Sequence, residues 1–170
     1  SIRMKAIANG NRDVGRMLFL LGNLFRNQLK EDDIITIKKE INYCKEYLEL
    51  FKFRYDDKFN YYINCEPELL NKKIIKFILQ PLAENYTVHG IRREDYDNEL
   101  HINIFKNGNN IKIVIEDNGI GIDKNKINEI NQKIKDKDFT GKSIGIANTH
   151  ERIMLLYGEE YGLKIDEEFE

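Results

Sequence analysis

The first third of the chain carries apolar residues at helical spacing. Within residues 11–29 they recur every three or four positions, which places them along one side of a helix: Val14, Met17, Leu18, Leu21, Leu24, Phe25 and Leu29. A polar run at residues 30–33 interrupts this pattern, and Thr36 then offers an N-cap to a second helix. The apolar stripe of that helix comprises Ile37, Ile41, Cys44, Tyr47, Leu48 and Phe51. We therefore predict two consecutive helices, each with an apolar side that needs a partner.

Strand-like alternation follows the two helices. Residues 59–64 alternate between apolar and polar positions, which predicts a strand that a proline then ends. Residues 100–104 and 111–115 alternate on either side of an Asn-Gly pair at 107–108, which predicts a β-hairpin. A last short apolar run at residues 163–165 predicts one more strand.

The other apolar segments favour helices. Residues 74–79 are helix-like, with Pro81 as the first residue of a renewed helical segment and Gly90 as its C-cap. Residues 127–134 and 145–157 also show helical character. Strands interleaved with helices and paired in a hairpin predict an α+β chain folded as a two-layer α/β sandwich. The helices within residues 11–51 would form a separate small layer.

Composition narrows the possible partners. The 170 residues are 41% hydrophobic, enough for one sizeable core. Lys and Arg (27) nearly balance Asp and Glu (29), so no net charge favours binding to nucleic acid or anionic lipid. Cys44 and Cys65 fit neither a metal site nor a redox pair, which favours a reducing cytoplasm. No apolar run approaches the roughly 18 residues of a membrane span, so we expect a fragment that is not membrane-inserted.

Three segments carry candidate chemistry. Residues 79–90 form a helix that presents Glu84 and Asn85 beside an apolar flank, a pattern that alone is typical of a solvated face. At residues 115–122 an Asp ends a hydrophobic strand and two glycines follow, which allows the backbone to approach a ligand closely. Residues 140–148 form a Gly-containing loop that opens a helix, a terminus suited to binding phosphate.

In this order, the three segments resemble the N box, G1 box and G2 box of the ATP-binding superfamily of gyrases, chaperones, kinases and mismatch-repair proteins. The amino-acid sequence of residues 79–90, 145–148 and 151–158 is similar to that of the membrane sensor histidine kinases of the YesM/LytS type. Residues 47–49 and 53–55 also match the linker helix of that family, so the resemblance spans nearly the whole chain. It implies a Bergerat-type fold with a mixed, mostly antiparallel sheet and helices on one face.

The resemblance also implies roles at the adenine and metal ends of an ATP site. Asn85 would hold the Mg²⁺ that bridges the phosphates, and Asp117 would accept a hydrogen bond from the adenine amino group. These residue types suit the tasks, because a carboxylate accepts from N6 and a carboxamide oxygen is a hard ligand. The remaining residues implied near the base are Gly119 and Gly121, which admit the purine, and the apolar walls Ile122 and Ile146.

Other implied roles concern the phosphates. Gly141 and Gly145 would flank a mobile lid whose Lys137 and Lys142 meet the phosphates. His89 would line the site or cap its helix. Two roles stay open for Glu84: it would help to bind or orient the waters around Mg²⁺-ATP, or it would face solvent or form a salt bridge. Arg152 is expected to pair with a nearby carboxylate.

Three positions depart from the family pattern. Val88 stands where a basic residue is usual, Ser143 replaces the middle glycine of the G2 box, and Tyr86 replaces a small residue. A degenerate nucleotide-binding or interaction module without turnover is therefore one alternative function. An ATP-hydrolysing relative is another, disfavoured because Pro81 occupies the position of the Glu that activates water there.

The resemblance predicts two parts and a kinase function. Residues 1–33 would be the C-terminal part of the dimerisation helices without the phospho-acceptor histidine, and residues 34–170 the ATP-binding catalytic domain, without its last strand. The domain would bind Mg²⁺-ATP and donate the γ-phosphoryl group to a histidine of the dimerisation domain, so the fragment itself would not autophosphorylate. The expected partners are ATP, the dimerisation domain of a homodimeric parent and a response regulator, with no nucleic acid. The expected location is the cytoplasmic side of a cell-membrane sensor.

Overall fold

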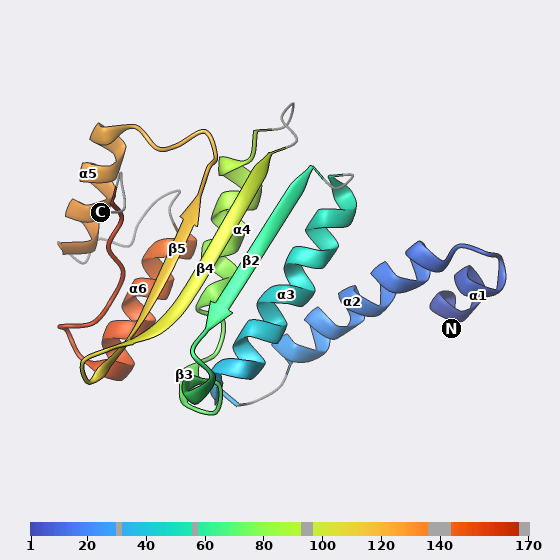
Figure 1. The fold of residues 1–170 in the computed structure, drawn as a ribbon, viewed down its shortest axis with the longest axis horizontal. Helices are drawn as coiled ribbons and strands as arrows, with labels where there is room; N and C mark the ends of the chain where they lie inside the picture. The colour runs from blue at the N-terminus through green and yellow to red at the C-terminus, as the bar shows by residue number, and fades with distance from the viewer. Residues whose placement is uncertain (30–31, 56–57, 93–96, 136–143, 167–170) are drawn as a thin grey trace.

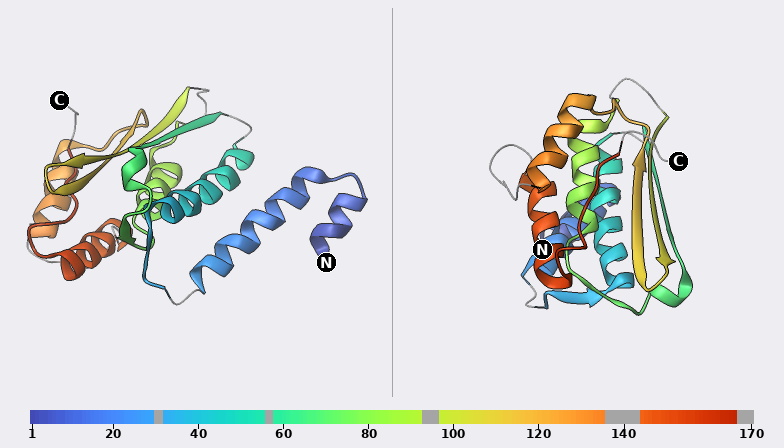
Figure 2. Two further views of the ribbon diagram at one scale, coloured as in Figure 1. Left: turned by 60° about the horizontal axis from the view of Figure 1, so that its bottom comes forward. Right: turned by 90° about the vertical axis from the view of Figure 1, so that its left-hand side faces the viewer.

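The computed structural model describes residues 1–29, 32–55, 58–92, 97–135 and 144–166. A three-stranded sheet forms one layer, and helices cover only one of its faces (Figures 1 and 2). The helices are α1 (Ile2–Ala8), α2 (Arg12–Gln28), α3 (Ile37–Arg54), α4 (Leu79–Asn85), α5 (Lys124–Lys135) and α6 (Ile144–Tyr157). The strands are β1 (Ile34–Thr36), β2 (Phe59–Cys65), β3 (Lys73–Ile75), β4 (Asn98–Asn107) and β5 (Asn110–Asp117). Two short helical turns are η1 (Pro67–Leu69) and the π-helical η2 (Tyr86–Gly90).

The main sheet has the strand order β2-β4-β5. Strands β2 and β4 are parallel, and β4 and β5 form the predicted antiparallel hairpin. Along β4, Leu100, Ile102 and Ile104 are buried toward the helices while the residues between them are only half-buried, as the alternation predicts. The predicted α+β sandwich with a mixed sheet and helices on one face is confirmed.

The predicted helices of the first third are also confirmed. The Thr36 hydroxyl accepts a hydrogen bond from the Lys39 amide and so caps α3. Helix α2 projects away from the sandwich beside α3 (Figure 1). It contacts α3 through polar groups, since Asn23 and Asn27 donate to the Glu46 carboxylate at 2.8 and 2.9 Å. Residues 2–8 form the additional helix α1, which the sequence pattern did not predict.

Three predictions about these elements are wrong. Residues 73–75 form strand β3 rather than a helix, because they pair antiparallel with β1. Helix α4 begins only at Leu79, so Pro81 lies within its first turn rather than at its first position. Residues 163–165 form no strand in the described part of the chain. Instead Leu163 donates to His150 Nδ1 at 2.9 Å, and Asn131 donates to the Ile165 carbonyl at 2.9 Å.

One apolar core lies between the sheet and the helices. Fully buried side chains of α3 and α4 belong to this core. All three strands of the main sheet contribute to it or pack against it. Its most enclosed members are Cys44, Leu48, Phe59, Leu79, Ala83, Leu100 and Ile102. Both cysteines are free thiols. Among the described residues, no helix is both long and apolar enough to cross a membrane.

Candidate functional site

The N-box helix presents one buried side and one exposed side. Helix α4 buries Leu79 and Ala83 against the core and continues into the π-helical turn of η2. Of the predicted site residues, Glu84 and His89 are exposed and Asn85 is half-buried. π-Helical turns are rare in proteins, and those that occur are often found at functional sites. The N box thus directs Glu84 and His89 toward solvent and leaves Asn85 half-buried.

The hydroxyl groups of Thr87 and Tyr47 hold the π-helical turn η2 on its buried side. Thr87 is fully buried, its hydroxyl donates to the Glu84 carbonyl at 3.2 Å, and it lies 2.8 Å from the Tyr47 hydroxyl of α3. Tyr86, also buried, packs its ring 5.8 Å from that of Phe59, and its hydroxyl has no hydrogen-bond partner among the described residues. Burial and the nearby Asp117 charge raise the pKa of Tyr86.

Asp117, the last residue of β5, lies where the sequence predicts. Its carboxylate accepts a hydrogen bond from the Gly119 amide at 2.9 Å. Desolvation by its neighbours raises the pKa of Asp117, and the Gly119 bond opposes this shift, although the side chain keeps contact with solvent. Gly121 has φ +72°, a conformation that favours glycine. The G1 segment therefore places a carboxylate acceptor at a turn.

The N box and the G1 box are in direct contact. The Ile120 amide donates to the Gly90 carbonyl at 2.8 Å. A Cβ on Gly119 would lie 2.3 Å from that same carbonyl oxygen, so any side chain there would separate the two segments. Gly119 thus has a packing role that the sequence did not reveal, in addition to the proximity to a ligand predicted for it. Ile122 remains partly exposed beside this junction.

The G2 segment is only partly described. Ile146 is buried at the start of α6, and the Gly145 carbonyl accepts from the Thr149 hydroxyl at 2.7 Å. Helix α6, whose first described residues are the end of the G2 segment, packs against α4 (Figure 1). The other predicted phosphate-binding and lid residues lie outside the described residues: Lys137, Gly141, Lys142 and Ser143.

Metal binding in this region would depend on a phosphate ligand. Within the described residues, no group of three or more His, Cys, Asp and Glu side chains is placed to hold an ion. Mg²⁺ commonly binds through one or two protein oxygens together with substrate phosphates and water. The half-buried carboxamide of Asn85 fits that mode of binding. The described residues offer no cluster that would hold the ion with protein ligands alone.

Sequence reasoning missed Glu40, whose buried carboxylate contacts the beginning of α4. The available signal was a carboxylate among the apolar positions of the α3 stripe. Arg152 was predicted to pair with a carboxylate, but its guanidinium donates to the backbone carbonyls of Lys76 and Phe77 at 2.7 and 3.2 Å. The Glu40 carboxylate and the Arg152 guanidinium thus both bond the turn that precedes α4.

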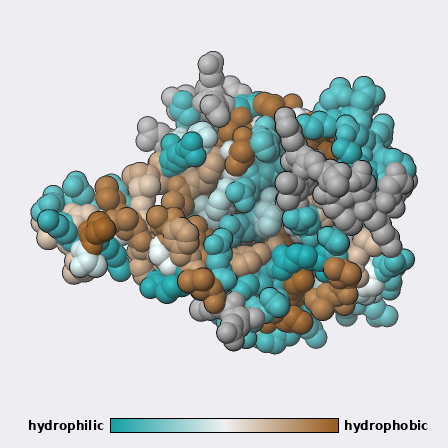
Figure 3. All heavy atoms as spheres, turned by 180° about the vertical axis from the view of Figure 1, so that it is seen from behind, coloured by the Kyte–Doolittle hydropathy of each residue, from teal (hydrophilic) through white to brown (hydrophobic). Residues whose placement is uncertain are grey.

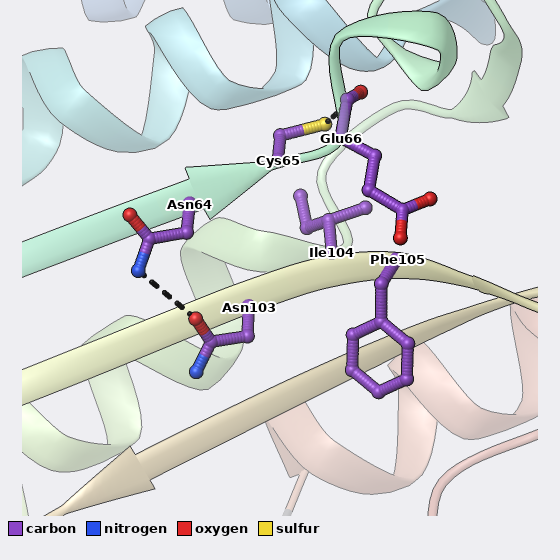
Figure 4. Close-up of a pocket in the computed structure, with 6 residues that line it drawn as sticks. All are labelled: Asn64, Cys65, Glu66, Asn103, Ile104 and Phe105. Carbon is purple, nitrogen blue, oxygen red and sulfur yellow. Dashed lines mark hydrogen bonds between the residues drawn. The ribbon is translucent and has the colours of Figure 1, made fainter.

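A separate hollow lies at the end of β2 (Figure 4). Across its rim, Asn64 donates to the Asn103 side-chain carbonyl at 3.0 Å. None of the predicted site residues lines it, so it is distinct from the region around Asp117. Its lining consists of Asn64, Cys65, Glu66, Asn103, Ile104 and Phe105.

Comparison with known proteins identifies the family. The model of the histidine kinase-, DNA gyrase B- and HSP90-like ATPases matches residues 72–168, and a histidine kinase model matches residues 1–59. The chain belongs to the family of histidine kinase-, DNA gyrase B- and HSP90-like ATPases. The predicted family and its enzyme class, histidine kinase, are therefore confirmed.

Curated relatives carry the same class in their names. Sensor histidine kinase YesM of Bacillus subtilis is 32% identical over 100% of this chain and 28% of its own length. Sensor histidine kinase YpdA of Escherichia coli is 35% identical over 88% of this chain and 26% of its own length. Sensor protein kinase HptS of Staphylococcus aureus is 27% identical over 85% of this chain. This chain thus spans little more than a quarter of the length of these relatives.

Proposed function

We propose that this chain binds Mg²⁺-ATP and donates its γ-phosphoryl group to a histidine within a two-component sensor kinase. The observation that carries the proposal is the junction of the N box and the G1 box, where Gly90 contacts Gly119 and Ile120 beside the Asp117 carboxylate. Family membership supports ATP as the nucleotide. The relatives named as sensor histidine kinases support a histidine as the acceptor.

At the base end, Asp117 would select adenine. Its carboxylate would accept a hydrogen bond from the N6 amino group, which guanine lacks at that position. The Gly119 amide already holds one carboxylate oxygen, so the orientation of the acceptor is set before the nucleotide binds. Gly121, with its positive φ, turns the chain so that Ile122 would lie against the purine.

At the phosphate end, Asn85 would hold the metal and Glu84 would orient its waters. The ion, when bound, neutralises phosphate charge, and the chain supplies position. Gly145 and Ile146 at the start of α6 would lie at the end of the lid. Lys142 and Gly141 are proposed to act there on the phosphates, although the described residues do not include them.

The acceptor histidine is proposed to belong to the dimerisation helices of the parent. This chain has three histidines, and none is suited to that role. His150 is buried, His101 lies half-buried on β4, and His89 is in the N box itself. We further propose a homodimeric membrane sensor as parent, with this domain in the cytoplasm and a response regulator as the next phosphoryl acceptor.

A degenerate module without turnover is the second candidate. Val88 is 51% exposed on the N-box turn, where a basic side chain would reach a phosphate. Phosphate contacts would then be fewer and the affinity for ATP lower. The ATP-hydrolysing alternative lacks a base at Pro81, because proline has no group that can take a proton.

Calorimetric titration with a non-hydrolysable ATP analogue, with and without Mg²⁺, tests the proposal. We expect micromolar to sub-millimolar binding that Mg²⁺ strengthens. Titration with the matching GTP analogue is the control for base selection, and it should give at least about tenfold weaker binding, since each 1.4 kcal/mol is tenfold in affinity. Absence of ATP binding at millimolar ligand would favour the degenerate module.

A further inference from the structure

The turn that precedes the N-box helix has an unusual backbone conformation. Phe77 has φ +58°, in the left-handed region that residues with a side chain rarely adopt. Such a conformation persists only where surrounding groups determine it. The Phe77 ring lies 5.9 Å from that of Tyr43, and its backbone is bonded on both its amide and its carbonyl side.

Glu40 holds the amide side of this turn. Its carboxylate, 1% exposed, accepts from the amides of Phe77, Ile78 and Leu79 at 2.9, 2.7 and 2.8 Å. The first amides of a helix have no partner within the helix, and a negative charge stabilises that end. Burial raises the pKa of Glu40, while the three amides and the charge of Arg152 oppose the shift. A side chain of α3 thus serves as the cap of α4.

Arg152 holds the carbonyl side. It lies on α6, and its two donors bind the Lys76 and Phe77 carbonyls at 2.7 and 3.2 Å. The same turn is therefore bonded to α3 through its amides and to α6 through its carbonyls. Helix α4 carries the N box, and α6 begins within the G2 segment. The Phe77 turn therefore links the two helices on which the proposed nucleotide site depends.

We propose that Glu40 and Arg152 are positioning residues for the metal end of the site, fixing the start of α4 relative to α6. This inference rests on the proposed function. Asn85 lies six residues beyond Leu79, about 9 Å along a helix at 1.5 Å per residue. A change in the direction of the first turn of α4 would therefore displace the Asn85 carboxamide, whereas the backbone of Asp117 is placed by the pairing of β5 with β4, opposite Leu100.

The substitution Glu40→Gln tests the proposal in the full chain. Glutamine keeps the size of the side chain, but its NH₂ group cannot accept from the Phe77 amide. We expect the ratio of ATP-analogue affinity with Mg²⁺ to that in EDTA to fall about tenfold, as for groups that orient a metal ligand. Affinity in EDTA, which reports the adenine end, should stay within about twofold. Arg152→Lys, which keeps the charge but not the two-pronged donor, should act in the same direction.

Glu49→Gln is the matched control, because it neutralises another α3 carboxylate that bonds Arg16 and Tyr61 and does not touch the Phe77 turn. It should leave the Mg²⁺ ratio unchanged. An equal loss of affinity with Mg²⁺ and in EDTA for Glu40→Gln would overturn the positioning role, since that pattern indicates general loosening. An unchanged ratio would overturn it as well.

Hydrogen exchange of the nucleotide-free chain separates this inference from the proposed function. In Glu40→Gln the amides of residues 77–85 should exchange faster, while those of β4 and β5 keep their protection. Unchanged exchange at residues 77–85 would refute the positioning role of Glu40 even if ATP binds. Conversely, if the wild type fails to bind ATP but Glu40→Gln still speeds exchange at residues 77–85, the proposed function is refuted and the role of Glu40 in holding this turn is supported.

Discussion

Asp117 is the residue on which base recognition should depend most. Its carboxylate is oriented by the Gly119 amide and lies beside the N box. We predict that Asp117→Ala lowers affinity for the ATP analogue by about 10- to 100-fold, because hydrogen bonds to charged groups contribute about 1.5–3 kcal/mol. The measurement is calorimetric titration, and circular dichroism should show an intact fold. Glu116→Ala, one residue earlier on β5, is the control and should bind normally.

Asn85 tests the metal end separately. We predict that Asn85→Ala reduces affinity about tenfold or more in Mg²⁺ and much less in EDTA, since its oxygen would act only through the ion. Parallel titrations under the two conditions give the comparison. The exposed carboxamide of Asn42 on α3 offers the control, Asn42→Ala. Equal losses in both conditions would remove the metal role from Asn85.

Two tyrosines give opposite predictions for stability. Within the part of the chain that the structure describes, the buried Tyr86 hydroxyl has no hydrogen-bond partner, whereas the Tyr47 hydroxyl bonds Thr87 at 2.8 Å. A buried polar group without a hydrogen bond costs about 1–3 kcal/mol, and a hydrogen bond that is formed contributes about 1 kcal/mol. Urea unfolding should therefore show a higher free energy of unfolding for Tyr86→Phe and a lower one for Tyr47→Phe. A destabilised Tyr86→Phe would mean that an ordered water satisfies the hydroxyl.

Residue types at motif spacing could be predicted from the sequence, but partners across the fold could not. The order of Asn85, Asp117 and Gly145 predicts a nucleotide site because the three segments together resemble a known family, whereas each alone is typical of a solvated face or a turn. The role of Glu40 depends on a helix that begins 39 residues later, and the spacing of residues around Glu40 does not predict its contact with the Leu79 amide. The contact of Gly119 with Gly90 is hidden for the same reason.

His150 connects α6 to the last described segment. Its Nδ1 accepts from the Leu163 amide, and burial lowers its pKa from the ordinary 6.5. The unfolded chain then binds the proton at higher pH than the folded chain does. The free energy of unfolding is therefore full above about pH 6.5 and decreases as pH falls toward the folded pKa.

The measurement is urea unfolding at pH 7.0 and 5.5 for the wild type and for His150→Asn, which keeps an acceptor but does not titrate. We predict a smaller loss of stability at pH 5.5 in the variant. Carboxylates with raised pKa, such as Glu40, change both proteins alike, so the difference isolates His150. His101→Asn on β4 is the matched control. Parallel pH curves for wild type and His150→Asn would contradict the prediction.

At the scale of elements, long periodic segments could be predicted and short paired ones could not. Helices α2 and α3 and the β4-β5 hairpin follow directly from spacing. Strand β3 has three residues and exists because β1 pairs with it, so its apolar run is compatible with a helix until the partner is known. Residues 163–165 have strand composition, but hydrogen bonds to His150 and Asn131 hold them instead.

Helix α3 connects the molecule as a whole. Glu46 accepts from the two asparagines of α2, and Glu40, on the same helix, caps α4. Glu49 adds a third contact, to Arg16 of α2. The division into residues 1–33 and 34–170 stays a prediction, and these contacts show that α3 touches both parts.

The exposed side of α2 bears on the assembly of the molecule. Its apolar side chains at positions 14, 18, 21 and 25 follow the alternating spacing of a coiled-coil seam. Of these, Leu21 is 41% and Phe25 is 58% exposed, on the helix that projects from the sandwich, and the rear view shows apolar surface along this projection (Figure 3). Burying these apolar side chains against a second copy of the chain would contribute about 25 cal/mol per Å² of apolar surface.

We predict weak self-association of this chain that Leu21→Glu with Phe25→Glu weakens about tenfold or more, because two carboxylates would enter the seam. Sedimentation velocity over a concentration series measures it. Leu155→Glu is the control, since Leu155 is 80% exposed on α6, away from α2, and the change should leave association unaltered. If Leu155→Glu disrupts association and the α2 pair does not, the interface lies on the sandwich, and the dimerisation role proposed for the N-terminal helices fails.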